Sequence, residues 1–264
     1  MPEFFHLNCV TIHSPLSENV GGHCLLIKEG ERLILVDTGI GLNDVQFPEE
    51  RIGKELITLV GYVFDENQTA TRQITKLGFK PEQVTDCIIT HLDNDHIGGL
   101  ADFPHARVHL SEEEMQNYTN GNPRYLTPPM AHGPRLHTYP GSADRWLGME
   151  ARKLDIPIST ALYLVPLPGH TMGHCGVAIE TAEGWLLYAG DAYYLREEFT
   201  NPLHPVHTLA AMRADDNILR MQSLEKIRTL MNTYPAMKVY SYHDGNEFQM
   251  EDVRWQIADI KSAI

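Results

Sequence analysis

The sequence predicts a layered α/β protein, an αββα sandwich in which two β-sheets pack together and helices cover their outer faces. Three observations predict this fold class. Short apolar runs typical of buried strands recur in both halves of the chain, helix-like segments accompany them, and polar residues follow directly on several strands. We expect the functional site at the edge where the two halves meet.

The first half is expected to begin with a meander of strands and to continue with alternating helices and strands. A helix over residues 70–77 is ended by Gly78, and Ser111 with Glu114 is typical of a capping box that starts another helix. Residues 40–66 are expected to be irregular and to cover part of the site. Strands are expected at residues 7–12, 24–27, 33–36, 87–90 and 107–110.

The second half repeats this strand-rich style. From Asp215 to Met231, apolar residues recur at helical spacing, and residues 253–260 are expected to form a closing helix. Strands are expected at residues 162–165, 177–179, 185–188 and 237–240.

We expect a single domain over residues 1–264, because 264 residues with 42% hydrophobic composition suffice for one large core. Residues 118–160 break the pattern, since they are rich in Pro, Gly, His and aromatic residues. A stretch this long is typical of a cover over a functional site or of an insertion. Its apolar residues, such as Trp146, either line a pocket over the site or anchor the segment to the fold.

The formal charge of -14 argues against a nucleic acid as partner, because phosphate binding relies on lysine and arginine. No apolar run approaches the roughly 18 residues of a membrane span, and residues 1–6 lack the features of a signal peptide. We therefore expect a cytoplasmic protein that binds neither nucleic acid nor membrane. The cysteines are expected to be small buried residues in a reducing compartment; they are Cys9, Cys24, Cys87 and Cys175.

One stretch concentrates residues that bind metals. His91, Asp93, Asp95 and His96 lie within six positions, directly after the strand expected at residues 87–90. In extended backbone the first three would share one face, and the turn after Asp95 would bring His96 beside them. A strand end can hold ligands rigidly while the loop leaves a coordination position open. The alternative is a solvated polar loop, since Asp and Asn are common in turns.

Three more candidate ligands follow strands later in the chain: His170 in Leu-Pro-Gly-His-Thr, Asp191 in Tyr-Ala-Gly-Asp and His243 in Tyr-Ser-Tyr-His-Asp. Asp37, in Val-Asp-Thr-Gly, follows an early strand. In order and context these motifs resemble those of the metallo-β-lactamase superfamily, over about residues 20–245. The resemblance implies the αββα fold and a metal-dependent hydrolase.

The resemblance also implies how the ligands are divided. Asp37 would be a buried carboxylate that orients ligand groups, although coordination by Asp37 is the alternative. The ligands would be His91, Asp93 and His170 for one metal, Asp95, His96 and His243 for the other, and Asp191 as the bridge between them.

Asp93 departs from the family pattern, which usually has a histidine there, so the motif is His-x-Asp-x-Asp-His. An added carboxylate should make the metals weaker Lewis acids and favour harder ions. The flavodiiron branch, which resembles this sequence in having a Glu at the corresponding position, binds iron. We expect two divalent ions, zinc first, with iron or manganese as the alternatives that Asp93 raises. If Asp93 does not coordinate, the first site is incomplete.

A two-metal site can generate hydroxide near neutral pH, so the expected reaction is attack of a metal-bound hydroxide on a small carbonyl ester, lactone or thioester. One metal would stabilise the oxyanion, and Asp95 or Asp191 would handle protons. Asp191-Ala192-Tyr193-Tyr194 resembles the D-x-x-Y arrangement of the family's acyl-homoserine lactonases, which implies that Tyr194 approaches the substrate carbonyl. Tyr193 is a rival for this role, and packing beside the site is the alternative for Tyr194.

Two other classes of function stay open. Asp93 favours a non-haem iron oxidoreductase, although the chain is too short to add a flavin-binding domain. A non-catalytic metal-binding protein is opposed by the completeness of the other ligand positions. The expected partner is a small-molecule substrate, and the apolar insertion could serve as a contact between copies of the chain. Net charge disfavours phosphodiesterase and nuclease activity, and fold by itself does not fix the substrate.

Overall fold

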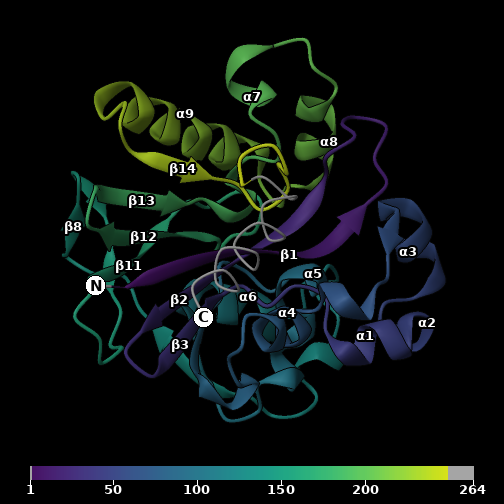
Figure 1. The fold of residues 1–264 in the computed structure, drawn as a ribbon. Helices are drawn as coiled ribbons and strands as arrows, with labels where there is room; N and C mark the ends of the chain where they lie inside the picture. The colour runs from purple at the N-terminus through teal and green to yellow at the C-terminus, as the bar shows by residue number, and fades with distance from the viewer. Residues whose placement is uncertain (1, 249–264) are drawn as a thin grey trace, which may run out of the picture.

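The computed structural model of the chain describes residues 2–248. Two sheets form the middle layers of the molecule, and helices lie on both outer sides (Figure 1). The αββα sandwich that the sequence predicts is therefore confirmed. The closing helix expected at residues 253–260 falls outside the described residues.

The larger sheet has a parallel half that positions part of the site. Its strands in spatial order are β4 (Tyr62–Val63), β1 (Glu3–Ile12), β2 (Gly21–Glu29), β3 (Arg32–Val36), β5 (Val84–Ile88), β6 (Arg107–Ser111) and β7 (Arg135–Tyr139). β1, β2 and β3 pair antiparallel, whereas β3, β5, β6 and β7 run parallel. Because parallel strands end at the same edge, the residues that follow β3 and β5 come together there.

The smaller sheet contributes the other part of the site. Its strands in spatial order are β10 (Arg152–Lys153), β11 (Leu162–Pro166), β12 (Cys175–Thr181), β13 (Gly184–Tyr188) and β14 (Lys238–Tyr240). β13 and β14 are parallel, so Asp191 and His243 follow two neighbouring strand ends. A separate ribbon is formed by β8 (Arg145–Trp146) and β9 (Met149–Glu150).

Two of the helices begin at a residue whose side chain caps them. Ser111 accepts a hydrogen bond from the Glu114 amide at 3.1 Å and so caps its helix, but the Glu114 side chain binds other groups, so only one half of the predicted capping box forms. Asp216 caps the helix at residues 217–233 through its side chain. The helices on the side of the larger sheet are α1 (Leu42–Gln46), α2 (Pro48–Arg51), α3 (Lys54–Val60), α4 (Ala70–Lys76), α5 (Asn94–Ile97) and α6 (Glu112–Thr119). Those on the side of the smaller sheet are α7 (Glu197–Thr200), α8 (Val206–Arg213) and α9 (Asn217–Thr233) (Figure 1).

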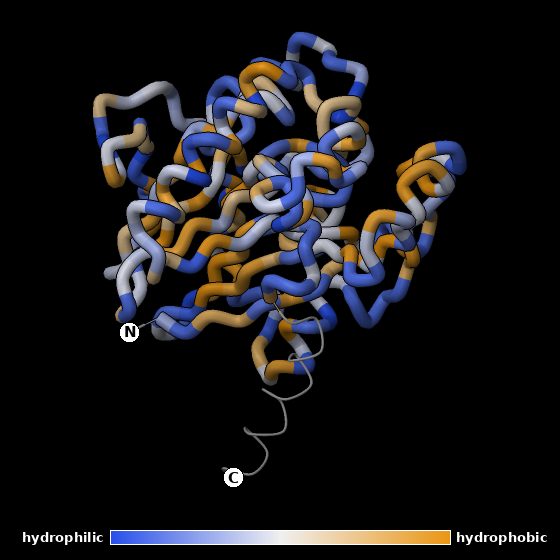
Figure 2. The backbone as a smooth tube through the Cα atoms, turned by 90° about the horizontal axis from the view of Figure 1, so that it is seen from above, coloured by the Kyte–Doolittle hydropathy of each residue, from blue (hydrophilic) through white to orange (hydrophobic). Residues whose placement is uncertain are grey.

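The core is built from strands that are covered on both faces. Leu25, Ile34 and Ile88 are fully buried, and Figure 2 shows apolar residues concentrated along the central strands. A second apolar cluster joins the smaller sheet to α9 through Leu224 and Ile227. All four cysteines are buried and free, as expected. Among residues 2–248, no helix has both the length and the apolarity that crossing a membrane requires.

The expectation of an irregular segment at residues 40–66 is wrong. This segment forms α1, α2, α3 and the edge strand β4. Pro48 starts one of these helices and Gly61, at φ 83°, ends another in the left-handed conformation. The helices are too short and too exposed to carry an apolar repeat, which is why the sequence pattern missed them.

The segment expected as an insertion, residues 118–160, contributes strands to both sheets. β7 pairs with β6 at the edge of the larger sheet, and β10 pairs with β11 in the smaller one. Trp146 is buried in the cluster that also contains the inner residues of α9, so its role is to anchor the segment. Four of the five residues of β7 are exposed, so the strand has no alternating pattern to read.

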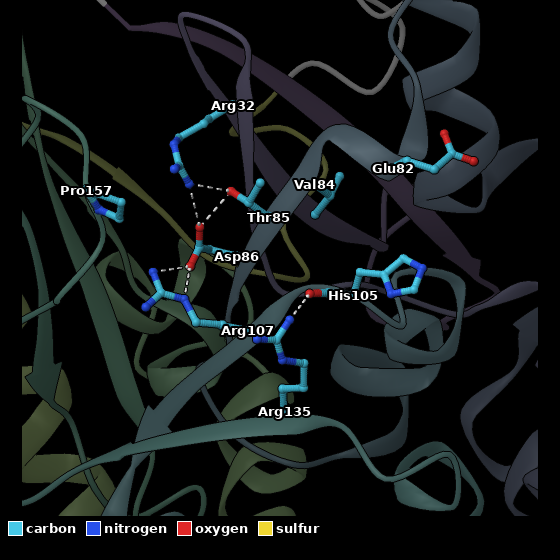
Figure 3. A pocket seen from close by; sticks show the side chains of 9 residues that line it. All are labelled: Arg32, Glu82, Val84, Thr85, Asp86, His105, Arg107, Arg135 and Pro157. Atoms are coloured by element: carbon cyan, nitrogen blue, oxygen red, sulfur yellow. Dashed lines mark hydrogen bonds and ion pairs between the residues drawn. The ribbon is translucent and has the colours of Figure 1, made fainter.

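A polar pocket lies where the parallel strands of the larger sheet begin, at the end opposite to the candidate ligands (Figure 3). Arg32, Arg107 and Arg135 line it around the buried carboxylate of Asp86. Asp86 Oδ1 accepts hydrogen bonds from Arg107 Nε at 3.0 Å and from His109 Nε2 at 2.9 Å. This end of the sheet therefore has a buried aspartate and histidine pair of its own, away from the strand ends that carry the candidate ligands.

Replacing Arg220 by Met should destabilise the fold. Arg220 Nη1 lies 2.6 Å from Glu198 Oε2, and both side chains are buried. Removing one partner leaves a buried charge unpaired, which costs about 3–5 kcal/mol. Denaturation by urea measures the loss.

The double variant Glu198→Gln with Arg220→Met should regain part of that stability, because no buried charge then lacks a partner. A single variant as stable as the native protein would contradict the assignment.

Candidate metal centre

The central ligand stretch begins where β5 ends and continues into α5. His91, Asp93, Asp95 and His96 are all buried, with at most 7% of each residue exposed, so the stretch is not a solvated loop. The turn is fixed from the neighbouring strand, since the Thr90 amide donates to Asp37 Oδ1 at 2.9 Å. The sheet edge therefore holds these side chains in place before any ligand binds.

Three of the histidines have the same arrangement of partners. His91 Nδ1 lies 3.0 Å from Thr90 Oγ1, and His243 Nδ1 lies 2.9 Å from the Gly21 carbonyl oxygen. His96 Nδ1 lies 2.8 Å from Asp37 Oδ2. A hydrogen bond at Nδ1 fixes the ring and leaves Nε2 as the free nitrogen, which is how protein histidines are prepared for metal binding.

The candidate ligands gather into two groups around one shared carboxylate. Asp191 Oδ2 lies 3.4 Å from His170 Nε2 and 3.4 Å from His243 Nε2, while Asp191 Oδ1 lies 3.4 Å from His96 Nε2. Asp191 is therefore placed between the groups. Within each group the ligand atoms lie within 4.8 Å of one another; the groups are His91, His170 and Asp191, and Asp95, His96 and His243.

The donor set fits a divalent cation. His91 Nε2, His96 Nε2 and Asp191 Oδ1 are buried and have no hydrogen-bond partner. An unpartnered buried polar atom is costly, so three of them on or beside the carboxylate of Asp191 indicate a group that binds there. Burial, followed by the charge of His96, lowers the pKa of His91 well below its usual value, which keeps its lone pair available. Imidazole and carboxylate suit several divalent ions.

Asp93 is placed beside the first group but is held by an arginine. Its Oδ2 lies 3.1 Å from His170 Nε2 and 3.5 Å from His91 Nε2. Arg124 donates to both carboxylate oxygens of Asp93, from Nε at 2.8 Å and from Nη2 at 2.7 Å. Burial alone would raise the pKa of Asp93, but the hydrogen bonds and charge of Arg124 outweigh it and hold that pKa well below the usual value.

Arg124 is a site residue that the sequence reasoning missed. It lies in the segment at residues 118–160, and its side chain is only 11% exposed. The expectation that Asp93 weakens the metals as Lewis acids took no account of Arg124, whose charge offsets that of Asp93. Its position is separated from Asp93 by 31 residues, and no local pattern connects the two.

The sequence model of the metallo-beta-lactamase superfamily matches residues 18–234. The chain belongs to the metallo-beta-lactamase superfamily. Its relatives include a probable metallo-hydrolase of Mycobacterium tuberculosis, 37% identical over 257 residues that cover 93% of this chain and 81% of the relative. An N-acyl homoserine lactonase of Bacillus cereus is 27% identical over 188 residues, which cover 67% of this chain and 65% of the relative.

Solved structures of the superfamily share the fold. An N-acyl homoserine lactone hydrolase with the product N-hexanoyl-L-homoserine at its catalytic metal centre matches with a TM-score of 0.69, at 20% identity over 94% of both chains. A dizinc quorum-quenching lactonase in complex with a product matches with a TM-score of 0.64, at 19% identity, over 92% of this chain and 87% of the other. The two-sheet framework is thus common to these proteins.

The two adjacent tyrosines of this metallo-beta-lactamase superfamily member point to different places. The Tyr194 hydroxyl lies 3.3 Å from His170 Nδ1, and the Tyr194 ring is centred 5.1 Å from that of His243. The Tyr193 hydroxyl instead donates to Glu247 at 2.8 Å. The structure therefore places Tyr194, and not its rival Tyr193, beside the ligand groups.

His174 is another residue that the sequence reasoning missed. Its Nδ1 donates to the Leu167 carbonyl oxygen at 3.0 Å, and its Nε2 accepts from the Asp191 amide at 3.0 Å. Burial, with a smaller contribution from His170, lowers the pKa of His174 to about 3, so the ring stays neutral and can accept. The neighbouring Gly190 has φ 55°, and a Cβ there would lie 2.8 Å from His174 Nε2. The sequence does hold a signal for this residue, because Gly173-His174 repeats the Gly169-His170 pair four residues later.

Glu114 links the two loops that carry ligands. Its Oε1 accepts from the Leu92 amide at 2.8 Å, and its Oε2 accepts from the Thr171 hydroxyl at 2.6 Å. Tyr125, from the segment at residues 118–160, also donates to Oε1 at 2.7 Å. The first turn of α6 thereby fixes the spacing between the central stretch and the His170 loop.

Replacing Asp37 by Asn should weaken metal binding while the fold is retained. An amide has one acceptor oxygen, so it cannot hold both Thr90 and His96 as the carboxylate does. Loss of such a partner typically lowers metal affinity about 10–100-fold. Competition with a chelator measures the change.

Asp86→Asn is the matched control, because it removes a buried carboxylate from His109 at the opposite end of the sheet. It should leave metal affinity unchanged. An equal loss in both variants would mean that the effect is a general one on stability.

Proposed function

We propose that the protein is a metal-dependent hydrolase of small carbonyl esters, lactones or thioesters, with lactones as the first candidates. One observation carries the proposal: the carboxylate of Asp191 is shared between two ligand groups, and the Tyr194 hydroxyl lies beside them. The metallo-hydrolase of Mycobacterium tuberculosis and the lactonase of Bacillus cereus support it as relatives.

The proposed cofactors are two divalent ions, zinc first. The dizinc lactonase with the same fold supports zinc. Iron or manganese is the alternative, raised by the flavodiiron resemblance and by the negative charge of Asp93; Arg124 offsets that charge and so weakens the second of these grounds. When bound, such ions polarise a carbonyl oxygen and lower the pKa of water, so that no protein nucleophile is needed.

The side chains divide the remaining work. Asp191 and Asp95 are the proposed proton carriers, since each carboxylate lies within 4 Å of the His243 imidazole and borders the space between the groups. Burial, and then the charge of Asp191, raises the pKa of Tyr194, so its hydroxyl stays protonated and can donate to a substrate carbonyl oxygen.

Tyr194 is positioned by the buried ion pair under it. Glu198 Oε1 accepts from the Tyr194 amide at 2.7 Å, and Glu198 Oε2 is held by Arg220. The backbone of Tyr194 is therefore tied to α9, while its hydroxyl is left at the site. Such support from a rigid helix suits a group that has to meet a reacting carbonyl.

The proposed partner is a small-molecule substrate. The net charge of -14 repels polyanions such as nucleic acids, and the ligand groups are buried except for the partly exposed His243. A compact neutral ester or lactone ring can enter such a site more readily than a polymer can.

The proposal is tested with protein purified without added metal. Elemental analysis should find a divalent metal, and lactone, ester and thioester substrates should be hydrolysed in a manner that a chelator abolishes and zinc restores. Iron accompanied by oxygen uptake would instead favour an oxidoreductase. Absence of both metal and hydrolysis would leave a binding protein on the same fold.

Replacing Tyr194 by Phe should lower lactone turnover by at least about tenfold, because a hydrogen-bond donor to the developing oxyanion is lost. Metal content should stay the same. Steady-state kinetics and elemental analysis measure the two effects.

Tyr193→Phe is the matched control, since it removes a neighbouring hydroxyl that binds Glu247 instead of facing the site. Turnover should stay near the native value in this variant. Unchanged turnover in Tyr194→Phe would remove Tyr194 from the mechanism.

A further inference from the structure

We propose that Arg124 makes the two metal positions unequal. Its guanidinium competes with a metal ion for Asp93 and His170, so the position beside His91 and His170 binds its ion weakly. The second, tight position is the one formed by four side chains to which Arg124 makes no hydrogen bond: Asp95, His96, His243 and Asp191. This inference rests on the proposed metal centre.

The competition follows from the contacts of one nitrogen. Arg124 Nη2 lies 2.7 Å from Asp93 Oδ2 and 3.1 Å from His170 Nε2. A neutral imidazole has a single lone pair, at the ring nitrogen that carries no proton. If Arg124 donates to that lone pair, it is not free for a metal ion.

The pattern of unpartnered atoms agrees with this interpretation. Nε2 of His91 and Nε2 of His96 are buried without a hydrogen-bond partner, whereas Nε2 of His170 already has partners in Arg124 and Asp93. In the first position, His170 Nε2 therefore already has hydrogen-bond partners. In the second position, His96 Nε2 has none.

The guanidinium is held in place by groups that take no part in metal binding. Arg124 Nη1 donates to the carbonyl oxygens of His170 and Arg213, at 2.8 and 3.0 Å, and to Asp215 Oδ1 at 2.8 Å. Asp215 is itself fixed by the side-chain amide of Asn122 at 2.9 Å. Because these acceptors lie outside the ligand groups, Arg124 stays beside the first position whether or not Asp93 binds a metal.

The guanidinium also occupies the carboxylate of the first position. Asp93 and Asp215 both pair with Arg124 and offset its charge, so Arg124 competes with a metal ion for lone pairs and does not act as an unpaired cation. Within residues 2–248, no lysine or arginine nitrogen lies within 4.0 Å of a carboxylate oxygen of Asp95 or Asp191. The carboxylates of the second position are therefore not held by a guanidinium as Asp93 is, and the two positions differ in the lone pairs that a metal ion can use.

Titration of the metal-free protein with Zn²⁺ tests the inference directly. The native protein should bind one ion tightly and a second at least about tenfold more weakly. Calorimetry gives the two dissociation constants, and elemental analysis after dialysis should find close to one ion per chain.

Variants test whether Arg124 causes the difference in affinity and which of the two positions is the weak one. Arg124→Gln and Arg124→Met remove the competing guanidinium, so the second ion should bind at least about tenfold more tightly and the dialysed protein should hold close to two ions. Arg135→Gln is the matched control, because it removes an arginine from the exposed edge strand β7 and should leave both constants unchanged. Asp93→Asn should leave the dissociation constant of the tightly bound ion unchanged. His243→Ala should abolish the tight binding.

Two equal affinities in the native protein would overturn the inference, as would Arg124 variants that keep the native gap. Circular dichroism establishes which variants are folded, and the native titration and Asp93→Asn test the inference even if both Arg124 variants fail to fold. If the native protein binds no ion at all, the proposed metal-dependent function is overturned. If it binds two ions with equal affinity, only the inference of unequal positions is overturned.

Discussion

The arrangement of the site depends on one buried carboxylate. Asp37 follows β3 in a left-handed conformation, with φ 53°, which aspartate tolerates better than most residues. Its oxygens accept from the amide and hydroxyl of Thr90 after β5, from the His96 ring, and from the Tyr188 hydroxyl at the end of β13. It thereby joins the ends of strands from both sheets at the point where the metal ligands begin.

Because the ligands come from both sheets, the site exists only when the sheets pack correctly. His91 and His96 follow a strand of the larger sheet, whereas Asp191 and His243 follow strands of the smaller one. The unpartnered atoms of His91, His96 and Asp191 cost free energy in the metal-free protein, so a bound ion would stabilise the packed state. Metal binding and the stability of this interface should therefore be linked.

Asp93 and Arg124 explain how the chain tolerates a carboxylate where its superfamily usually has a histidine. Together they carry no net charge, so the pair replaces a neutral ring by a neutral ion pair in a buried place. The pair differs from a histidine in one respect: the guanidinium adds a hydrogen-bond donor beside His170. Replacing the histidine by this pair therefore leaves the total charge nearly the same, but it changes which atoms of the first position can bind a metal ion.

The sequence by itself determined the fold class and the candidate ligand set, because buried strands leave apolar runs and the ligands follow directly on them. It also determined the start of α6, since Ser111 caps its own helix. Only the tertiary structure decided the contacts of Arg124 and His174 with the ligand groups and the place of the exposed strand β7. The contacts of Arg124 and His174 join residues far apart along the chain, so no local pattern predicts them. The edge strand β7 is too exposed to show an alternating pattern of apolar residues.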